Sequence, residues 1–327
     1  MIATITLNPS LDEHIAVNGL IVEEANRWSK LYRYAAGKGI DVSRAIHEMG
    51  GETMAYGFIG GPKGRTVEIL LDEEGVPYSF TPIRQETRTN FIITDTKTYK
   101  QTRIDAPGPP ISKKALERFY RKIELSLSKL DILVAAGSIP PGIPKDIYYD
   151  LVLKARTSKV RAFVDTGNEG LKEAIKAKPY LIKPNVHEAE GLLGIELDSE
   201  EAIIRAALRL VKTGIKIVVI SRGKDGIIAA TEEKVFKAVP PQLKVKSAVG
   251  AGDCTLAGLA LKLAKNGSLM EACRLGVAMG AATVLTPGTE LCHRDDVERL
   301  LPQIKVWEMT VKQWAKTPFT VSNKVLS

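Results

Sequence analysis

Residues 131–165 carry the sequence DILVAAGSIPPGIPKDIYYDLVLKARTSKVRAFVD, and this stretch decides the fold. It begins with an apolar run at 131–136 and ends with a second apolar run at 161–165. Between them, residues 144–156 have helical spacing. Two short apolar runs joined by a helix predict a strand–helix–strand unit, in which the two strands are parallel and helices cover the sheet.

The same alternation continues on both sides of this unit. Apolar runs predict further strands at 1–7, 53–59, 180–183 and 215–220. Helical spacing predicts helices at 40–49, 64–74, 170–177, 200–213, 252–266 and 269–285. The sequence therefore predicts an α/β protein with a mainly parallel central sheet that is flanked by helices in three layers.

Two segments depart from this alternation. Residues 13–35 and 88–106 are rich in Thr, Tyr, Ile and Arg and alternate partly with period two, which predicts antiparallel strands apart from the main sheet. We expect them to form a small β lid over the ligand-binding face, and a flat face of that lid could pair with another subunit. Residues 1–305 form the expected domain, and residues 306–327 show no clear pattern and stay unassigned.

Composition limits the classes of function. The net charge is +8, and the basic residues behind it are spread along the chain and mixed with acidic ones. This pattern favours anionic small substrates over nucleic acid. The apolar runs are too short for a membrane span, and the start of the chain lacks the basic segment of a signal peptide. Three cysteines without metal-like spacing favour a reduced, cytoplasmic setting.

The segment Val249-Gly250-Ala251-Gly252-Asp253 leads into the predicted helix at 252–266. Its small residues let backbone N–H groups gather at a helix N-terminus, which carries partial positive charge and suits an anion. Asp253 in that place is either a simple helix cap or a general base beside a phosphoryl group. These residues alone leave both interpretations open.

Other polar motifs follow predicted strands, where open parallel sheets bind ligands. Asp12 could accept hydrogen bonds from sugar hydroxyls or stabilise its own turn, and Ser138 could hold a phosphate or belong to a proline turn. The turn at 37–39 opens a helix but lacks the spacing of a Walker A loop. Asn185 and Glu188, three residues apart, could position Mg²⁺ through waters.

The turn at 221–226 completes this set of motifs. Its glycines, Gly223 and Gly226, would let a nucleotide lie against the backbone. A plain β-turn is the alternative interpretation.

The order and placement of these motifs closely resemble the PfkB (ribokinase-like) carbohydrate kinase family over about residues 1–300. Within it, the chain resembles the phosphofructokinase and tagatose-6-phosphate kinase branch, through residues 8–12, 87–90 and 137–142. Residues 287–296 resemble the minor bacterial 6-phosphofructokinase type, whereas residues 24–27 resemble 1-phosphofructokinases and tagatose kinases. The resemblance implies a ribokinase-like three-layer fold with a β lid.

The resemblance also implies an activity, ATP-dependent phosphorylation of a phosphorylated ketohexose. The leading expectation is fructose 6-phosphate to fructose 1,6-bisphosphate, with fructose 1-phosphate or tagatose 6-phosphate as alternatives. A sugar-phosphate-binding protein without turnover is the alternative from another class, although the intact motif that ends in Asp253 disfavours it. A homodimer through the lid is expected, and neither nucleic acid nor membrane is expected as a partner.

Residue roles follow from the same resemblance. Asp253 would take the proton from the sugar hydroxyl, and the N–H groups of Gly250, Ala251 and Gly252 would bind the transferring γ-phosphoryl group. Mg²⁺ would lie near Asn185 and Glu188. The expected sugar and phosphate ligands are Asp12, Gly37, Lys38, Gly39, Asp41, Arg88, Arg103, Ser138, Arg27 from a neighbouring subunit and, more weakly, Asp165. The expected nucleotide contacts are Asn185, Ser221, Gly223, Gly226, Ala248 and Gly280.

Asp41 departs from the family pattern, since this branch usually has asparagine after the Gly-Lys-Gly-Ile or Gly-Gly-Gly-Ile segment. An ionised carboxylate only accepts hydrogen bonds, whereas an amide also donates. Either the substrate's hydroxyl pattern differs, or Asp41 pairs with Lys38 or Arg44.

Overall fold

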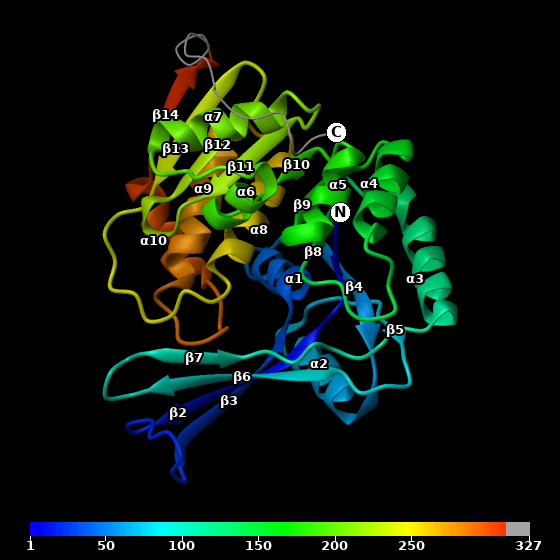
Figure 1. The fold of residues 1–327 in the computed structure, drawn as a ribbon, viewed down its shortest axis with the longest axis vertical. Helices are drawn as coiled ribbons and strands as arrows, with labels where there is room; N and C mark the ends of the chain where they lie inside the picture. The colour runs from blue at the N-terminus through cyan, green and yellow to red at the C-terminus, as the bar shows by residue number, and fades with distance from the viewer. Residues whose placement is uncertain (312–327) are drawn as a thin grey trace.

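The computed structural model describes residues 1–311 of the chain. A ten-stranded sheet forms its centre, in the order β14-β13-β12-β11-β10-β9-β8-β1-β4-β5 (Figure 1). Read in this order, neighbouring strands between β11 and β5 are parallel, and neighbouring strands between β14 and β11 are antiparallel. The strands are β1 (Ile2–Thr6), β4 (Thr53–Ile59), β5 (Thr81–Pro82), β8 (Ile132–Ala136), β9 (Arg161–Asp165), β10 (Leu181–Ile182), β11 (Ile217–Ser221), β12 (Ile227–Ala230), β13 (Lys234–Val239) and β14 (Lys305–Thr310).

Helices cover both faces of this sheet. They are α1 (Lys38–Glu48), α2 (Gly61–Glu74), α3 (Lys113–Ser126), α4 (Ile147–Thr157), α5 (Asn168–Lys176), α6 (Val186–Leu193), α7 (Glu200–Val211), α8 (Ala251–Ala264), α9 (Leu269–Thr283) and α10 (Arg294–Leu300). Within residues 1–311, no helix combines the length and apolarity that a membrane crossing requires.

The alternation of side chains along each strand explains the three layers. Leu133 and Ala135 of β8 pack into the core beneath α3 to α7, whereas Ile132 and Val134 pack into the core beneath α1, α8, α9 and α10. A strand that is buried on both faces carries apolar residues without interruption, as 132–136 does. The predicted three-layer α/β fold is confirmed.

The predicted lid is also present, and Figure 1 shows it projecting from the main body. It is a four-stranded sheet in the order β3-β2-β6-β7, built from β2 (Ser10–Val17), β3 (Trp28–Ala36), β6 (Arg88–Asp95) and β7 (Gln101–Ile104). The β2–β3 and β6–β7 pairs are antiparallel, but the central β2–β6 pair is parallel. That parallel pair joins the two chain segments that the sequence marks as lid.

Residues 305–310, at the end of the described chain, form β14 and pair with β13. Trp307 lies on this strand, and the Lys237 ammonium is 5.6 Å from the centre of its ring. The segment left unassigned at 306–327 thus begins inside the main sheet. Its other two aromatic residues, Trp314 and Phe319, lie outside the described residues.

Candidate active site

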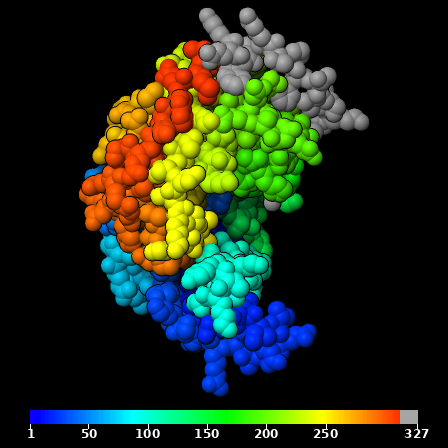
Figure 2. Space-filling model, turned by 90° about the vertical axis from the view of Figure 1, so that its left-hand side faces the viewer, coloured from blue at the N-terminus to red at the C-terminus, as the bar shows by residue number. Residues whose placement is uncertain are grey.

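A cavity of about 540 Å³ lies where the lid meets the carboxyl ends of β1 and β8 and the start of α8. Figure 2 shows the lid segment of β6 and β7 beneath the loop that precedes α8. Ser247 of that loop lies within 3.5 Å of Gln101 at the start of β7. The cavity is lined by Thr6, Asn8, Ser10, Asp12, Gly37, Lys38, Asp41, Arg88, Gln101, Arg103, Asp105, Gly137, Ser138, Ala248, Val249, Gly250, Asp253 and Thr289.

Asp253 lies in the first turn of α8 and faces this cavity. The helix cap is Gly250, whose φ of 80° is in the left-handed region that favours glycine. Interpreting Asp253 as a simple cap is therefore wrong. Burial raises the pKa of its carboxyl to about 7, Lys38 opposes this rise and Asp165 adds to it. A carboxyl with this pKa can exchange a proton near neutral pH.

Asp165, at the end of β9, holds two lysines. It is only 1% exposed, and its oxygens lie 2.8 Å from Lys38 Nζ and 2.8 Å from Lys183 Nζ. Although burial opposes ionisation, Lys183 and Lys38 lower the pKa of this carboxyl. Asp165, the weaker candidate for a sugar contact, is not among the residues that line the cavity, and its carboxylate is paired with the two lysines.

Lys183 is the residue whose position the sequence interpretation missed. A Cβ on Gly252 would lie 3.4 Å from the Lys183 ammonium, which places that charge beside the first turn of α8. Lys183 directly follows a buried strand, and ligand sites of parallel sheets lie at strand ends, so its position in the sequence could have indicated it. Lys38 reaches the same region, and although burial disfavours its charged form, Asp165 and Asp253 raise its pKa.

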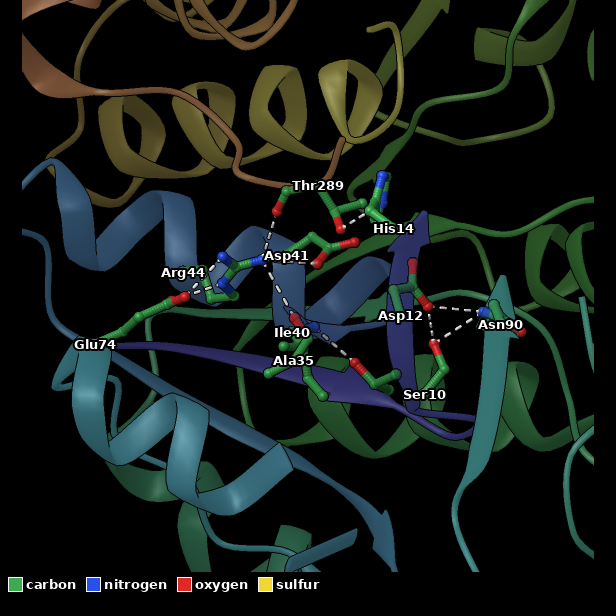
Figure 3. A network of polar contacts seen from close by, with 11 residues as sticks. Ser10, Asp12, His14, Ala35, Ile40, Asp41, Arg44, Glu74, Asn90 and Thr289 are labelled. Atoms are coloured by element: carbon green, nitrogen blue, oxygen red, sulfur yellow. Dashed lines mark hydrogen bonds and ion pairs between the residues drawn. The ribbon is translucent and has the colours of Figure 1, made fainter. Parts of the chain in front are cut away.

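Asp12 lies on β2 with its carboxyl almost fully buried. Its Oδ1 accepts hydrogen bonds from Ser10 Oγ at 2.7 Å and from Asn90 Nδ2 at 2.9 Å (Figure 3). Burial raises the pKa of Asp12, and these two donors counteract that effect. Asn90, which faces Asp12 across the β2–β6 pair, fixes the carboxyl toward the cavity.

Asp41 lies in the first turn of α1, and its neighbour Arg44 is tied elsewhere (Figure 3). Arg44 binds Glu74 through Nε at 2.6 Å and Nη2 at 2.7 Å, and its Nη1 donates to the carbonyls of Ala35 and Thr289. The closest approach between Arg44 Nη1 and Asp41 Oδ1 is 3.7 Å. Lys38 bonds Asp165 instead, so neither expected pairing supplies Asp41 with a hydrogen bond.

The expected phosphate ligands line the cavity from two sides, Arg88 and Arg103 from the lid strands β6 and β7 and Ser138 from the loop after β8. Arg88 donates to the carbonyls of Ala106 at 2.6 Å and Asn8 at 3.0 Å. Arg103 pairs with the exposed Asp105 at 2.7 Å. Ser138 Oγ accepts a hydrogen bond from Asn8 Nδ2 at 3.1 Å, which makes Asn8 a link between the two sides.

The glycine turn before α1 has two functions. Gly37 lines the cavity with a φ of 122°, and a Cβ there would meet the Thr6 side chain at 2.6 Å. Gly39 does not line the cavity; a Cβ there would meet the Ile5 carbonyl oxygen at 2.5 Å. Glycine at Gly39 thus lets α1 start directly against β1.

A second, open cavity of about 500 Å³ gathers three expected nucleotide contacts: Asn185, Ser221 and Gly223. Arg222 shapes this turn, since it donates to Glu200 at 2.7 Å and to the Asp225 carbonyl at 2.7 Å. Asn185 and Glu188 cap α6 reciprocally, each side chain accepting the other residue's backbone N–H at 2.8 Å.

Six other expected residues lie outside both cavities, among them Ala251 and Gly252 in the first turn of α8. A Cβ on Gly226 would lie 1.9 Å from the Ala238 carbonyl oxygen, and one on Gly280 would lie 2.3 Å from Thr255 Oγ1, so both glycines permit close packing. Arg27 is exposed in the loop between β2 and β3. Glu188 keeps one carboxylate oxygen outside its cap hydrogen bond.

Comparisons with known proteins agree on one family. The model of the pfkB family carbohydrate kinases matches residues 5–296. The 1-phosphofructokinase of Bacillus subtilis is 37% identical over 306 residues, 94% of this chain and 99% of that protein. The ATP-dependent 6-phosphofructokinase isozyme 2 of Mycobacterium tuberculosis is 35% identical over 299 residues, 91% of this chain and 88% of that protein.

A tagatose-6-phosphate kinase of Staphylococcus epidermidis is 30% identical over 312 residues, 94% of this chain and 100% of that protein. Among solved structures, phosphofructokinase-2 of Escherichia coli in complex with substrates and products superposes with a TM-score of 0.87. It is 34% identical, and the match covers 92% of this chain and 98% of that one.

Proposed function

The chain belongs to the PfkB family of carbohydrate kinases, and from this membership we propose that it transfers the γ-phosphoryl group of ATP to a phosphorylated ketohexose. The proposed substrate is fructose 6-phosphate, which gives fructose 1,6-bisphosphate. One observation carries the proposal: Asp253 in the first turn of α8 shares a cavity with Arg88 and Arg103 of the lid. A cavity that holds a candidate base and two arginines suits a substrate that already bears a phosphate, because arginine binds phosphate well.

In the proposed reaction, Asp253 accepts the proton of the sugar hydroxyl as its oxygen bonds to the γ-phosphorus. The bond from that phosphorus to the β–γ bridging oxygen breaks, and ADP leaves with the electron pair. The N–H groups at the start of α8 and the ammonium groups of Lys38 and Lys183 oppose the negative charge that spreads over the phosphoryl oxygens. Asp165 holds both ammonium groups in place.

The residues at the nucleotide side fit a hydrated Mg²⁺ rather than a direct metal cage. Within residues 1–311, no cluster of three or more His, Cys, Asp or Glu side chains has metal-binding geometry. Asn185 Oδ1 and Glu188 Oε2 are engaged in the α6 cap, which leaves Glu188 Oε1 as an acceptor. Mg²⁺ keeps several waters and binds few carboxylates beside substrate phosphates, where it neutralises charge. We propose that Glu188 holds the ion through water.

Fructose 1-phosphate and tagatose 6-phosphate are the alternative substrates, because relatives of similar identity are named for those activities. The deciding experiment compares kcat/KM with Mg-ATP across these two sugars, fructose 6-phosphate, free fructose and ribose. A preference for fructose 6-phosphate supports the proposal. A preference for another sugar phosphate retains the kinase and changes its substrate, whereas no turnover on any sugar supports a binding protein.

We predict that Arg88→Ala raises the KM for the sugar phosphate at least tenfold more than the KM for ATP. One charge-assisted hydrogen bond is worth about 1.5–3 kcal/mol, which corresponds to roughly a tenfold or larger change. Steady-state kinetics with each substrate varied in turn measure the split. Arg84→Ala, an exposed arginine outside the cavity, is the control. Equal rises in both KM values would remove Arg88 from the substrate-phosphate site.

We propose that the lid also forms a homodimer contact. Its face opposite Asp12 carries five apolar residues, since strand register places Ile15, Leu31, Phe91, Ile93 and Ile104 on one side. Phe91 and Ile104 are exposed. A solved relative is described as the tetrameric form of phosphofructokinase-2, which supports assembly in this family. In the proposed dimer, Arg27 reaches toward the neighbouring site.

The dimer proposal predicts that Phe91→Glu converts the protein to a monomer, because a charge would be buried without a partner at the contact. Light scattering after size-exclusion chromatography measures the mass. Leu125→Glu, which replaces an exposed apolar residue of α3 on the main body, should leave the mass unchanged. A dimer that persists in Phe91→Glu, or a monomeric wild type, would contradict the lid contact.

A further inference from the structure

Asp41 is a buried carboxyl of the candidate active site. Its side chain is 5% exposed and lines the cavity together with Asp12 and Asp253. Within the described chain, its Oδ1 has no hydrogen-bond partner. Burying an ionised carboxylate without donors is costly, so such a group is stable only when it is paired or neutral.

Arg44 does not supply the missing donor, although it is the nearest cation on the same helix. Nε and Nη2 of Arg44 are bound to the two oxygens of Glu74, and Nη1 donates to two backbone carbonyls. At 3.7 Å from Asp41, Arg44 Nη1 contributes charge but no hydrogen bond. Glu74 already balances most of that charge in a bidentate pair.

The other charged groups around Asp41 come from three elements. Asp253 and the Cys254 thiol lie on α8, Asp12 lies on β2, and Arg103 lies on β7. Burial raises the pKa of Asp41 well above its usual range, Asp253 and Asp12 raise it further, and Arg44 lowers it. Three carboxyls around one cavity cannot all ionise without strong repulsion.

We propose that Asp41 serves as a neutral carboxylic acid that donates its O–H to an oxygen of the sugar. This hydrogen bond selects a sugar that presents an acceptor at that position. When Asp41 loses the proton, the hydrogen bond is lost and the sugar phosphate binds more weakly. A neutral acid offers one donor and one acceptor, whereas an ionised carboxylate only accepts. An ionised Asp41 would lack the donor and repel the substrate's phosphate. The inference rests on the proposed function for the identity of the ligand.

The kinetic test compares the KM for fructose 6-phosphate in the wild type and in Asp41→Asn from pH 6 to 10. The ratio of the two KM values cancels the ionisation of the substrate. We expect this ratio to rise by about tenfold per pH unit above the ionisation of Asp41, because one proton is lost per site. Asp41→Ala should raise KM at every pH, and Asp105→Asn, which removes an exposed carboxylate of the same cavity, should retain the alkaline rise. A flat ratio would overturn the proposal.

The second test needs no substrate. A carboxyl that stays protonated in the folded protein loses its stabilising effect as the pH rises above about 4, where the unfolded chain ionises. The melting temperature of the wild type should therefore fall below that of Asp41→Asn progressively from pH 4 upward, until Asp41 ionises in the folded state. A pH-independent difference would overturn the neutral acid. If no sugar is turned over, the proposed function fails, and this measurement still decides the protonation of Asp41.

Discussion

Asp253→Asn should lower kcat by roughly 10²–10⁴-fold, the usual loss for a removed general base. Asparagine keeps the size and the place of the side chain in the first turn of α8, but its amide cannot accept the proton of the sugar hydroxyl. Binding of the nucleotide and of the sugar phosphate should change little, because the proposed base acts only as the hydroxyl attacks. Steady-state kinetics and isothermal titration calorimetry measure the two effects.

The pH profile provides a second readout for the same residue. Because the base must be ionised and burial raises the pKa of Asp253 to about 7, wild-type kcat should increase as the pH rises through about 7. In Asp253→Asn, this rise of kcat with pH should be absent. Glu271→Gln, an exposed carboxylate in the cap of α9, serves as the control and should keep it. Near-normal turnover by Asp253→Asn would exclude Asp253 as the base.

Asp165→Asn should reduce both stability and turnover. It removes the anion that pairs with Lys183, whose side chain is only 5% exposed, and leaves a buried ammonium without a partner. Breaking a buried pair in this way costs about 3–5 kcal/mol of the free energy of unfolding. Lys38 and Lys183 would also lose their fixed positions, so kcat should fall. Urea unfolding and steady-state kinetics measure these changes.

Glu200→Gln is a matched control, because Glu200 also binds two cations, Arg222 and Lys237, but its side chain is 38% exposed. Arg222 is 9% and Lys237 29% exposed, and Glu200 itself stays partly in water, so this variant should lose less stability than Asp165→Asn does. Asp165 also helps to raise the pKa of Asp253, so the acid limb of kcat in Asp165→Asn should move to lower pH. If the two variants lost equal stability, and if the acid-side rise of kcat in Asp165→Asn stayed at the wild-type pH, the role of Asp165 would be contradicted.

Much of the fold could be predicted because its strands are short apolar runs and its helices have regular spacing. The βαβ unit at 131–165 and the two long helices at 252–285 show this best. Three antiparallel strands were missed: Ile227–Ala230 is only four residues long, and Lys234–Val239 and Lys305–Thr310 mix charged and apolar residues. The helix Lys113–Ser126 was also missed, although Ser112 caps it and Phe119 and Ile123 form part of its buried face.

The candidate site was predicted less completely than the fold. Strand ends correctly indicated which loops gather, and ten of the expected residues line one cavity: Asp12, Gly37, Lys38, Asp41, Arg88, Arg103, Ser138, Ala248, Gly250 and Asp253. Pairings between distant residues were not predictable, because periodicity carries no information about partners. Asp165 bonds Lys38 across 127 positions, and Arg44 reaches Thr289 across 245.

The parallel pairing of β2 with β6 has a consequence for the order of folding. Asp12 receives one of its two hydrogen bonds from Asn90, which lies 78 residues later in the chain. Pairing over such a separation must first overcome the entropy of closing the intervening loop. The two antiparallel pairs of the lid are local, but the pair that joins them is not, and we expect it to form after β1 and β4 have paired in the main sheet. Hydrogen exchange during refolding should protect β8 and β9 before β6, so that the proposed sugar site is completed only after the main sheet has formed.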